Sequence, residues 1–500
     1  MATQQKRVGL VVLGSEGYMA QNVFSSLPQV KRRLELSGIQ LLVLVLADIK
    51  YYSSDAGVAA SARASAELNL GDLNQARFAK NADSALGEIK QQEIGQGLDA
   101  IVVYDCSPTG FHDDNFIRVL DSGISRLFYF GEKPIVIDPA TLADIRRSAS
   151  GIPFFCDFIE TANPAVITTK KFVELNRLSI RSMRFWRASA SGIKHIIGHT
   201  QGGVQGGAIL DKAPHDLSIA TMLLGPERIR EWVVPKAPAR TFHLIPRAAE
   251  TEGFELLDRR NRFVSDSDVR FDVRSMEGGG RFTIPADGLS RFDVDWTLDD
   301  GQAVHSEYLA SWIGYTGHRD DGEAHPEEQR FVEELSKLGI DRELWMLKET
   351  YEVPRSGRAC TESQARISII EAEDPKGRKC TIVSNYLIHL KEPGVKAFER
   401  WVRVFWDNDQ SGMSIPVDNA QTYHDQKVLD LGGTFEAVIR DCCGGPKAQF
   451  LGSLPTMIVH DAMLRAGDFC TESAAEQHLS KSFDYRKTWD ILKASIRPEL

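Results

Sequence analysis

Short apolar runs alternate with amphipathic segments in the N-terminal part of the chain. The first run, Val8 to Leu13, leads into a glycine-rich turn, and helical spacing of apolar residues then continues to Leu36. The second run, Ile39 to Ala47, is apolar at nearly every position, which is typical of a strand buried on both faces of a parallel sheet. Two more buried strands are predicted at residues 100–104 and 126–130, with a helix between them. This order predicts a doubly wound α/β domain with a parallel sheet.

The apolar pattern changes toward that of antiparallel strands from about residue 180. One segment alternates strictly and then reaches an Asp-Asp-Gly turn, which is a strong hairpin signal. Its apolar positions are Phe292, Val294, Trp296 and Leu298. We therefore expect an α/β protein of two domains: a Rossmann domain over residues 1–150, and an α/β domain with a large, mostly antiparallel sheet over residues 151–500.

Composition and charge narrow the classes of partner. The chain is 42% hydrophobic and 26% charged, as in ordinary globular proteins, and its formal net charge of −10 argues against a nucleic-acid partner. The apolar runs are shorter than the roughly 20 residues of a membrane span, and none follows the pattern of a signal peptide. The seven cysteines lack a metal-like CxxC spacing, so we expect reduced thiols and no metal site. These features predict a cytoplasmic protein with neither a nucleic-acid nor a membrane partner.

The turn after the first apolar run suits a dinucleotide. The G-x-G-x-x-G/A fingerprint aligns with Ser15, Gly17 and Ala20, with Gly14 one residue early, and the turn alone is equally compatible with a tight structural turn. Asp48 ends the second apolar run, where a carboxylate can bind ribose hydroxyls, and this favours NAD. Lys50 leaves NADP open. The predicted cofactor contacts of this part are Gly14, Ser15, Gly17, Tyr18, Met19 and Asp48.

A second group of polar residues follows two later strands. Ser107-Pro108 comes after one of them, and Lys133 comes directly after the other. Ligands of open α/β sheets bind at the carboxyl ends of the strands, so both places can contact a bound molecule. A lysine after a buried strand is also commonly just a solvated loop charge.

Asp211 and His215 lie four residues apart at the start of an apolar, helix-like segment. Residues at this spacing share a helix face, and a buried ionisable pair costs several kcal/mol unless it is satisfied or used. Oxidation of a secondary alcohol needs a base, a cation near the developing alkoxide and a nicotinamide. His215, Lys133 and the N-terminal domain can supply one each, with Asp211 orienting the imidazole or binding a hydroxyl. The structural alternative for His215 is a buried, hydrogen-bonded histidine.

In order along the chain, five motifs resemble the Gfo/Idh/MocA oxidoreductase family, which includes inositol dehydrogenases and glucose–fructose oxidoreductase. They are the glycine turn, SPTGFH, GEKPIVID, ANPAV and GGAILDKAPHD. The resemblance covers the first half of the chain, and the second half has no motif that matches in detail. It implies a Rossmann domain followed by an α/β domain whose mostly antiparallel sheet forms a wall of the substrate cleft and often an oligomer interface.

The resemblance also implies roles for individual residues. Lys133 is similar to the lysine beside the nicotinamide and the substrate hydroxyl, and Asp211 and His215 are similar to the family's D-x-x-x-H pair. The family tends to have a glycine two residues before the histidine and an aspartate three residues after it. This chain has Ala213 and Ser218 at those positions. Further cofactor contacts are implied at Ser107, Pro108, His112, Glu132 and Lys133.

The predicted function is an NAD(P)-dependent oxidoreductase acting on a secondary hydroxyl or ketone of a sugar, a sugar derivative or a cyclic polyol. The alternatives are a redox-neutral NAD-dependent glycoside hydrolase, a non-catalytic dinucleotide-binding regulator, and an aldehyde, imine or tetrapyrrole reductase. The antiparallel sheet favours a homodimer or homotetramer. The predicted substrate contacts are Lys133, Trp186, Arg187, His195, His199, Asp211 and His215. For the two histidines of the glycine-rich loop, a zinc site would need partners that the sequence does not identify.

Overall fold

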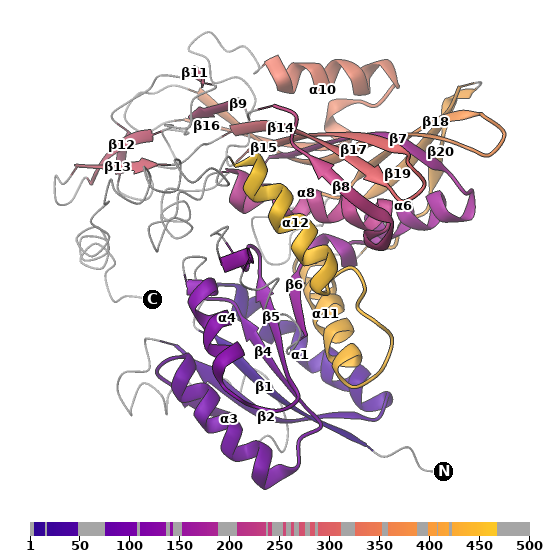
Figure 1. Cartoon of the computed structure of the whole chain (residues 1–500). Coiled ribbons are helices and arrows are strands. Elements are labelled where there is room, and N and C mark those ends of the chain that lie inside the picture. The colour runs from indigo at the N-terminus through magenta and orange to yellow at the C-terminus, as the bar shows by residue number, and fades with distance from the viewer. Residues whose placement is uncertain are drawn as a thin grey trace. The chain divides into compact units, whose positions relative to one another are not determined.

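The computed structural model of the chain is drawn in Figure 1. It describes residues 5–15, 18–48, 76–107, 111–136, 141–143, 153–188, 208–236, 239–242, 254–256, 262–264, 270–275, 281–285, 289–311, 326–352, 359–387, 399–407, 409–419 and 423–467. The chain divides into two compact units. The first contains the described residues up to Asn163 and those from Tyr423 to His460, and the second contains the others.

A six-stranded parallel sheet with the order β3-β2-β1-β4-β5-β6 forms the centre of the first unit. Its strands are β1 (Lys6–Leu13), β2 (Ile39–Ala47), β3 (Ala76–Ala79), β4 (Ala100–Asp105), β5 (Leu127–Glu132) and β6 (Phe154–Asp157). Helices α3 (Ala82–Gln96) and α4 (His112–Asp121) cover one face, and α1 (Tyr18–Leu36) and α11 (Tyr423–Cys442) cover the other (Figure 1). This order is that of a Rossmann sheet, so the predicted fold of the N-terminal part is confirmed.

Helix α11 belongs to the first unit although it lies far along the chain. The Phe435 ring of α11 meets the Tyr104 ring of β4 edge-on, with the ring centroids 5.6 Å apart. Glu436 forms an ion pair with Arg33 of α1 at 2.7 Å. The predicted division into residues 1–150 and 151–500 has one cut, whereas the compact units cut after Asn163 and interleave. The units interleave because α11, far along the chain, packs beside α1 on the same face of the parallel sheet.

The second unit is built on a mostly antiparallel sheet with eleven described strands, as predicted. The order is β11-β9-β14-β15-β7-β17-β18-β19-β20, with β16 on β17 and β8 on β14, and only the β15–β7 pairing is parallel among the described pairs. The strands are β7 (Ser179–Ala188), β8 (Ile229–Val233), β9 (Ala239–Phe242), β11 (Arg262–Val264), β14 (Leu289–Leu298), β15 (Ala303–Ser311), β16 (Met346–Glu352), β17 (Ala359–Glu373), β18 (Lys379–Asn385), β19 (Trp401–Trp406) and β20 (Asp409–Ile415). The predicted hairpin is β14–β15, whose turn contains Gly301 at φ +81°.

Further elements complete the described part. A small sheet contains β10 (Phe254–Leu256), β12 (Arg270–Ser275) and β13 (Arg281–Pro285). The helices are α6 (Pro164–Leu175), α8 (Ala208–Leu224), α10 (Pro326–Lys337) and α12 (Ser453–Ala466), and short 3-10 turns are η2 (Ile159–Ala162), η3 (Pro226–Arg228) and η4 (Arg342–Leu344). Helix α8 lies on one face of the large sheet and α10 on the other (Figure 1).

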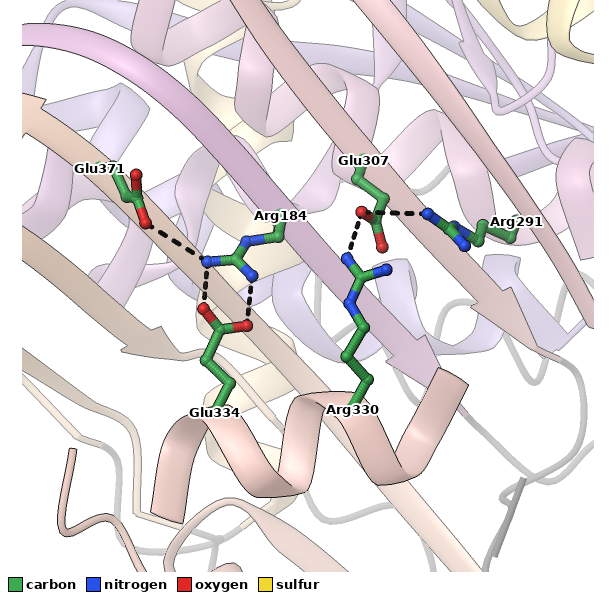
Figure 2. A network of polar contacts seen from close by, with 6 residues as sticks. All are labelled: Arg184, Arg291, Glu307, Arg330, Glu334 and Glu371. Atoms are coloured by element: carbon green, nitrogen blue, oxygen red, sulfur yellow. Dashed lines mark hydrogen bonds and ion pairs between the residues drawn. The ribbon is translucent and has the colours of Figure 1, made fainter. Parts of the chain in front are cut away.

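Ion pairs and an apolar cluster together hold α10 on its sheet face. Arg184 of β7 pairs with Glu334 of α10 through both guanidinium nitrogens and with Glu371 of β17 at 3.5 Å (Figure 2). Arg330 of α10 pairs with Glu307 of β15 (Figure 2). The Phe331 ring of the same helix packs against Trp186, with ring centroids 5.5 Å apart. The helix is therefore attached by a buried aromatic contact and by charged pairs.

We predict that the aromatic contact contributes more to stability than the ion pairs. Phe331 is 1% exposed, so Phe331→Ala leaves a cavity and should lower the free energy of unfolding by about 3–5 kcal/mol. Arg330 is 40% exposed, and Arg330→Ala should cost less than about 1 kcal/mol because solvent screens the pair and Arg291 still contacts Glu307. Urea denaturation of both variants measures the two costs. An equal or reversed order would contradict this account of the helix.

Candidate functional site

The strand order places a close main-chain approach at the centre of the parallel sheet. The direction of winding reverses between β1 and β4, which is where ligands of such sheets bind. Gly14, directly after β1, has φ +72°, and a Cβ there would lie 2.6 Å from the Cα of Ser107 after β4. Only glycine fits both the backbone conformation and the space. Ser15 follows and is 1% exposed, and its N–H donates to the carbonyl of Ala47 at the end of β2 at 3.2 Å.

The structure describes only some of the other residues of the predicted dinucleotide fingerprint. Ala20, in the first turns of α1, is fully buried, as expected where the helix packs closely on the sheet. Met19 is half-buried, and Asp48 is half-buried directly after β2. Tyr18 begins α1, but its side chain lies outside the described part. Gly17, Pro108, His195, His199 and Lys50 also lie outside the described residues.

Ser107 is held in place by residues that the sequence analysis did not identify. Its N–H and hydroxyl both donate to Asp105 Oδ1, at 3.1 and 2.6 Å, and Tyr129 donates its hydroxyl to Asp105 Oδ2 at 2.9 Å. The amide of Asn115 donates to the Ser107 hydroxyl at 3.1 Å. The loop after β4 is thus fixed by a buried carboxylate, and its only sequence signal is an acid that ends a buried strand.

His112 links the loops that follow β4 and β5. The side chain is 1% exposed, and its ring nitrogens lie 2.7 Å from two main-chain oxygens, Nε2 from that of Ser107 and Nδ1 from that of Pro134. The resemblance implies a cofactor contact for His112. The structure places both of its ring nitrogens on the main chain of neighbouring loops.

Two buried carboxyl groups end β5 and β6. Glu132 and Asp157 are register partners on these parallel strands, so their side chains share a face of the sheet. Tyr104 donates its hydroxyl to Glu132 Oε1 at 2.7 Å, and Asp157 Oδ2 lies 3.4 Å from the same hydroxyl. Burial raises the pKa of Asp157 well above its ordinary value, and the charge of Glu132 raises it further. Glu132 therefore points into the interior. The following residue, Lys133, is half-buried, and its bond to Pro134 is cis.

Asp211 and His215 lie on α8, in agreement with the predicted helix. Asp211 is 2% exposed and its Oδ2 lies 2.8 Å from the ammonium of Lys212, which is a charge partner that the sequence analysis missed. His215 is half-buried, and its carbonyl accepts a hydrogen bond from the Ser218 hydroxyl at 2.6 Å. The Asp211 carboxylate is therefore paired with a cation on its own helix.

A buried ion pair attaches α8 to the sheet next to His215. Asp216 Oδ1 lies 3.0 Å from both Nε and Nη2 of Arg187 on β7, and both residues are 1% exposed. Tyr386 donates its hydroxyl to the same oxygen at 3.0 Å. Such a pair is costly to bury and depends on its full set of hydrogen bonds. Arg187 thus holds the helix that carries His215.

Trp186 lies on the opposite face of the sheet from Arg187. Successive side chains of a strand point to opposite faces. Trp186 is 1% exposed and packs edge-on against Trp345, with ring centroids 5.2 Å apart, in the core under α10. The structure therefore does not bring Trp186 and Arg187 to one surface, and Trp186 is a core residue.

Among the described residues, neither a metal site nor a membrane-spanning helix is present. They contain no group of three or more His, Cys, Asp or Glu side chains that could hold a metal ion. No helix among them has both the length and the apolar character needed to cross a membrane.

Comparison with known proteins identifies the fold. No protein-family model matches the chain, and no curated protein does. An NAD-binding oxidoreductase from Klebsiella pneumoniae is 14% identical with a TM-score of 0.51, and the match covers 92% of this chain and 95% of that one. An oxidoreductase from Agrobacterium radiobacter, solved with NAD+, L-tartaric acid and magnesium, is 11% identical with a TM-score of 0.49 and coverage of 93% and 96%. An aldose-aldose oxidoreductase from Caulobacter crescentus, complexed with glycerol, is 11% identical with a TM-score of 0.48 and coverage of 93% and 98%. At these identities, the likeness to the Klebsiella structure establishes a shared fold.

We predict that Gly14→Ala is more harmful than the same change at another left-handed glycine. Gly38 has φ +76° but open space around a would-be Cβ, so Gly38→Ala should cost about 1–2 kcal/mol for the backbone conformation alone. Gly14→Ala adds the clash with Ser107 and should cost clearly more. Urea denaturation of both variants measures the two costs. Equal costs at both positions would mean that the β1 and β4 loops do not approach as described.

We predict opposite pH trends for two aspartates of the first unit. Because the pKa of Asp157 is raised above 3.8, its contribution to stability is present below that pH and is lost as the pH rises. Asp157→Asn should therefore gain stability relative to the wild type between pH 4 and pH 7. Asp99 has a lowered pKa, because the Arg7 N–H donates to its carboxylate at 2.9 Å. Its contribution is present above pH 3.8 and is lost as the pH falls below that value, so Asp99→Asn should lose stability relative to the wild type as the pH rises from about 2 to 4. Urea midpoints across each interval check both signs, and a reversed trend for either variant would refute the assignment.

Proposed function

We propose that the protein is an oxidoreductase of the Gfo/Idh/MocA type that transfers hydride between a nicotinamide dinucleotide and a secondary hydroxyl or ketone. The observation that carries this proposal is the Gly14 turn at the reversal point of a Rossmann sheet, followed on a later helix by Asp211 and His215. The shared fold with a protein described as an NAD-binding oxidoreductase supports the cofactor class. The proposed substrates are sugars, sugar derivatives or cyclic polyols, on the resemblance of the motifs.

The described residues fit a dinucleotide. The turn after β1 has no side chain at Gly14, and Ala20 lets α1 pack closely on the sheet. The amides of Gly14 and Ser15 donate to the Ala47 carbonyl, so the first main-chain N–H groups of α1 are the proposed donors to a pyrophosphate. Asp48, at the carboxyl end of the neighbouring strand β2, is the proposed partner of the ribose hydroxyls and favours NAD over NADP. The turn and the loop after β4 supply the other proposed contacts, at Ser15, Gly17, Tyr18, Met19, Ser107 and Pro108. A bound nicotinamide would supply the hydride acceptor or donor.

His215 is the proposed acid/base residue. It is half-buried, and imidazole exchanges protons near neutral pH. Asp211 pairs with Lys212, and its carboxylate is the proposed acceptor of a hydrogen bond from the imidazole or from a substrate hydroxyl. Lys133 is the proposed cation that stabilises a developing alkoxide.

Buried polar residues near His215 and near Lys133 support these proposed roles indirectly. Arg187 is committed to Asp216, so we assign it to holding α8 in place of the predicted substrate contact. His112 and Glu132 hold the loops after β4 and β5 through main-chain and interior contacts. His195 and His199 stay predicted substrate contacts in the glycine-rich loop, and a homodimer or homotetramer stays a prediction for light scattering.

The test is turnover with a panel of sugars and inositols and either NAD or NADP, followed by absorbance of the reduced nicotinamide. We expect stoichiometric reduction with a substrate of the panel. His215→Asn should lower kcat by about 10²–10⁴-fold and leave the dinucleotide Kd unchanged, because the proposed base is lost but the Rossmann unit is intact. His305→Asn is the matched control, since His305 is exposed on β15 and paired with Asp295 at 2.7 Å. It should retain full turnover.

The other outcomes separate the alternatives. A co-purified dinucleotide that is recycled during glycoside cleavage without net reduction would indicate the redox-neutral hydrolase. Dinucleotide binding without turnover on any substrate would favour the regulator. Failure to bind either dinucleotide would refute the proposal.

A further inference from the structure

His460 contacts the loop that carries Lys133, although the two lie far apart in the sequence. The imidazole of His460 on α12 is fully buried, and its Nε2 accepts a hydrogen bond from the Ile135 N–H at 2.9 Å. Both residues belong to the first unit. Ile135 is two residues after Lys133, and it is itself fully buried.

The partners of His460 define its tautomer. Nδ1 lies 2.7 Å from the carbonyl oxygen of Thr456, which can only accept, so Nδ1 carries the proton. The Ile135 N–H can only donate, so Nε2 is bare. Burial lowers the pKa of His460 to about 4, with the nearby His112 as a further cause, so the neutral form persists at physiological pH. The side chain therefore acts as an acceptor at one fixed position.

A second buried histidine holds the adjacent residue. His112 of α4 contacts the Pro134 carbonyl through Nδ1 at 2.7 Å. Pro134 and Ile135, the two residues after Lys133, are thus each bonded by an imidazole from a different helix. Glu132, the residue before Lys133, is held by the Tyr104 hydroxyl at 2.7 Å. Buried side chains of three different elements thus contact the residues around Lys133, two of them at the main chain after it and one at the side chain before it.

We propose that His460 is a positioning residue for Lys133, acting through the main-chain N–H of Ile135. Its effect on catalysis rests on the proposed function, in which the Lys133 ammonium stabilises a developing alkoxide. A misplaced catalytic group costs rate even when the residue itself is unchanged. A residue that only packs α12 would need its shape, whereas this role needs an acceptor atom at the position of Nε2.

Two conservative variants separate these roles. In His460→Gln the side-chain oxygen reaches the position of Nε2 and can accept from Ile135. In His460→Asn the shorter amide reaches only the position of Nδ1, near Thr456. Both are neutral amides, and each reproduces one of the two contacts of the imidazole, so only the Gln variant keeps the acceptor for Ile135. His460→Met fills the volume with no strong acceptor and replaces the Asn variant if that one does not fold.

The first measurement is hydrogen exchange of the Ile135 amide in the full-length protein, with urea midpoints as a check on folding. We expect about tenfold faster exchange in His460→Asn or His460→Met, and exchange near that of the wild type in His460→Gln. Mass spectrometry after brief treatment with an amine-acylating reagent then reports the reactivity of Lys133. This reactivity should change in the Asn and Met variants and should be preserved in the Gln variant.

The second measurement is steady-state kinetics with the substrate and dinucleotide found in the panel. His460→Asn should lower kcat about tenfold to a hundredfold while KM for the dinucleotide stays within about twofold, and His460→Gln should recover most of the loss. Wild-type exchange at Ile135 in all variants would overturn the proposal, and so would unchanged Lys133 reactivity where exchange is faster. If the wild type lacks dinucleotide-dependent turnover, the proposed function fails, but the exchange and acylation results still decide whether His460 positions Lys133.

Discussion

The close approach of two main chains beside the reversal point of the parallel sheet is the constraint on which the first unit depends. The turn after β1 and the loop after β4 meet where a Cβ on Gly14 would lie 2.6 Å from Ser107. That approach requires Ser107 to be held firmly, and Asp105 and Asn115 hydrogen-bond its side chain, while His112 Nε2 lies 2.7 Å from its carbonyl oxygen. His112 extends the same set of contacts to Pro134 after β5. The edge of the sheet where a ligand is expected is therefore an interconnected set of loops.

In the second unit the proposed acid/base residue, His215, lies on a helix, so its position depends on how that helix is held. Helix α8 is apolar along most of its length, and apolar packing alone allows small shifts along and about the helix axis. The Arg187–Asp216 pair adds a directional contact one residue after His215, and the Tyr386 hydroxyl completes it. Burying such charges is costly. We therefore interpret the pair as fixing the position of α8 on the sheet and not as a source of stability.

Local sequence patterns predicted the elements well and the long-range contacts poorly. The apolar runs, the strict alternation before the β14–β15 turn and the four-residue spacing of Asp211 and His215 each reflect the geometry of one element, and all appear in the structure. Asp157, His460 and the return of α11 depend on partners far away in sequence, which leave no periodic signal. The prediction that Trp186 and Arg187 both contact the substrate overlooked the alternation of side chains along β7, although that alternation is a local rule. For His112, the sequence identified the motif to which the residue belongs. It did not indicate that the ring nitrogens would lie next to two main-chain oxygens.

The segment from Glu132 to Ile135 shows why these long-range contacts matter for the proposed chemistry. A lysine side chain has four flexible bonds, so its ammonium can be placed accurately only if its main chain does not add further freedom. Here Tyr104 bonds the residue before Lys133, and His112 and His460 bond the two residues after it. The three contacts come from β4, α4 and α12, and therefore from parts of the first unit that only tertiary folding brings together. In this arrangement the position of the lysine is a property of the whole unit, because supporting residues must be locked by their own packing before a reacting group is well placed.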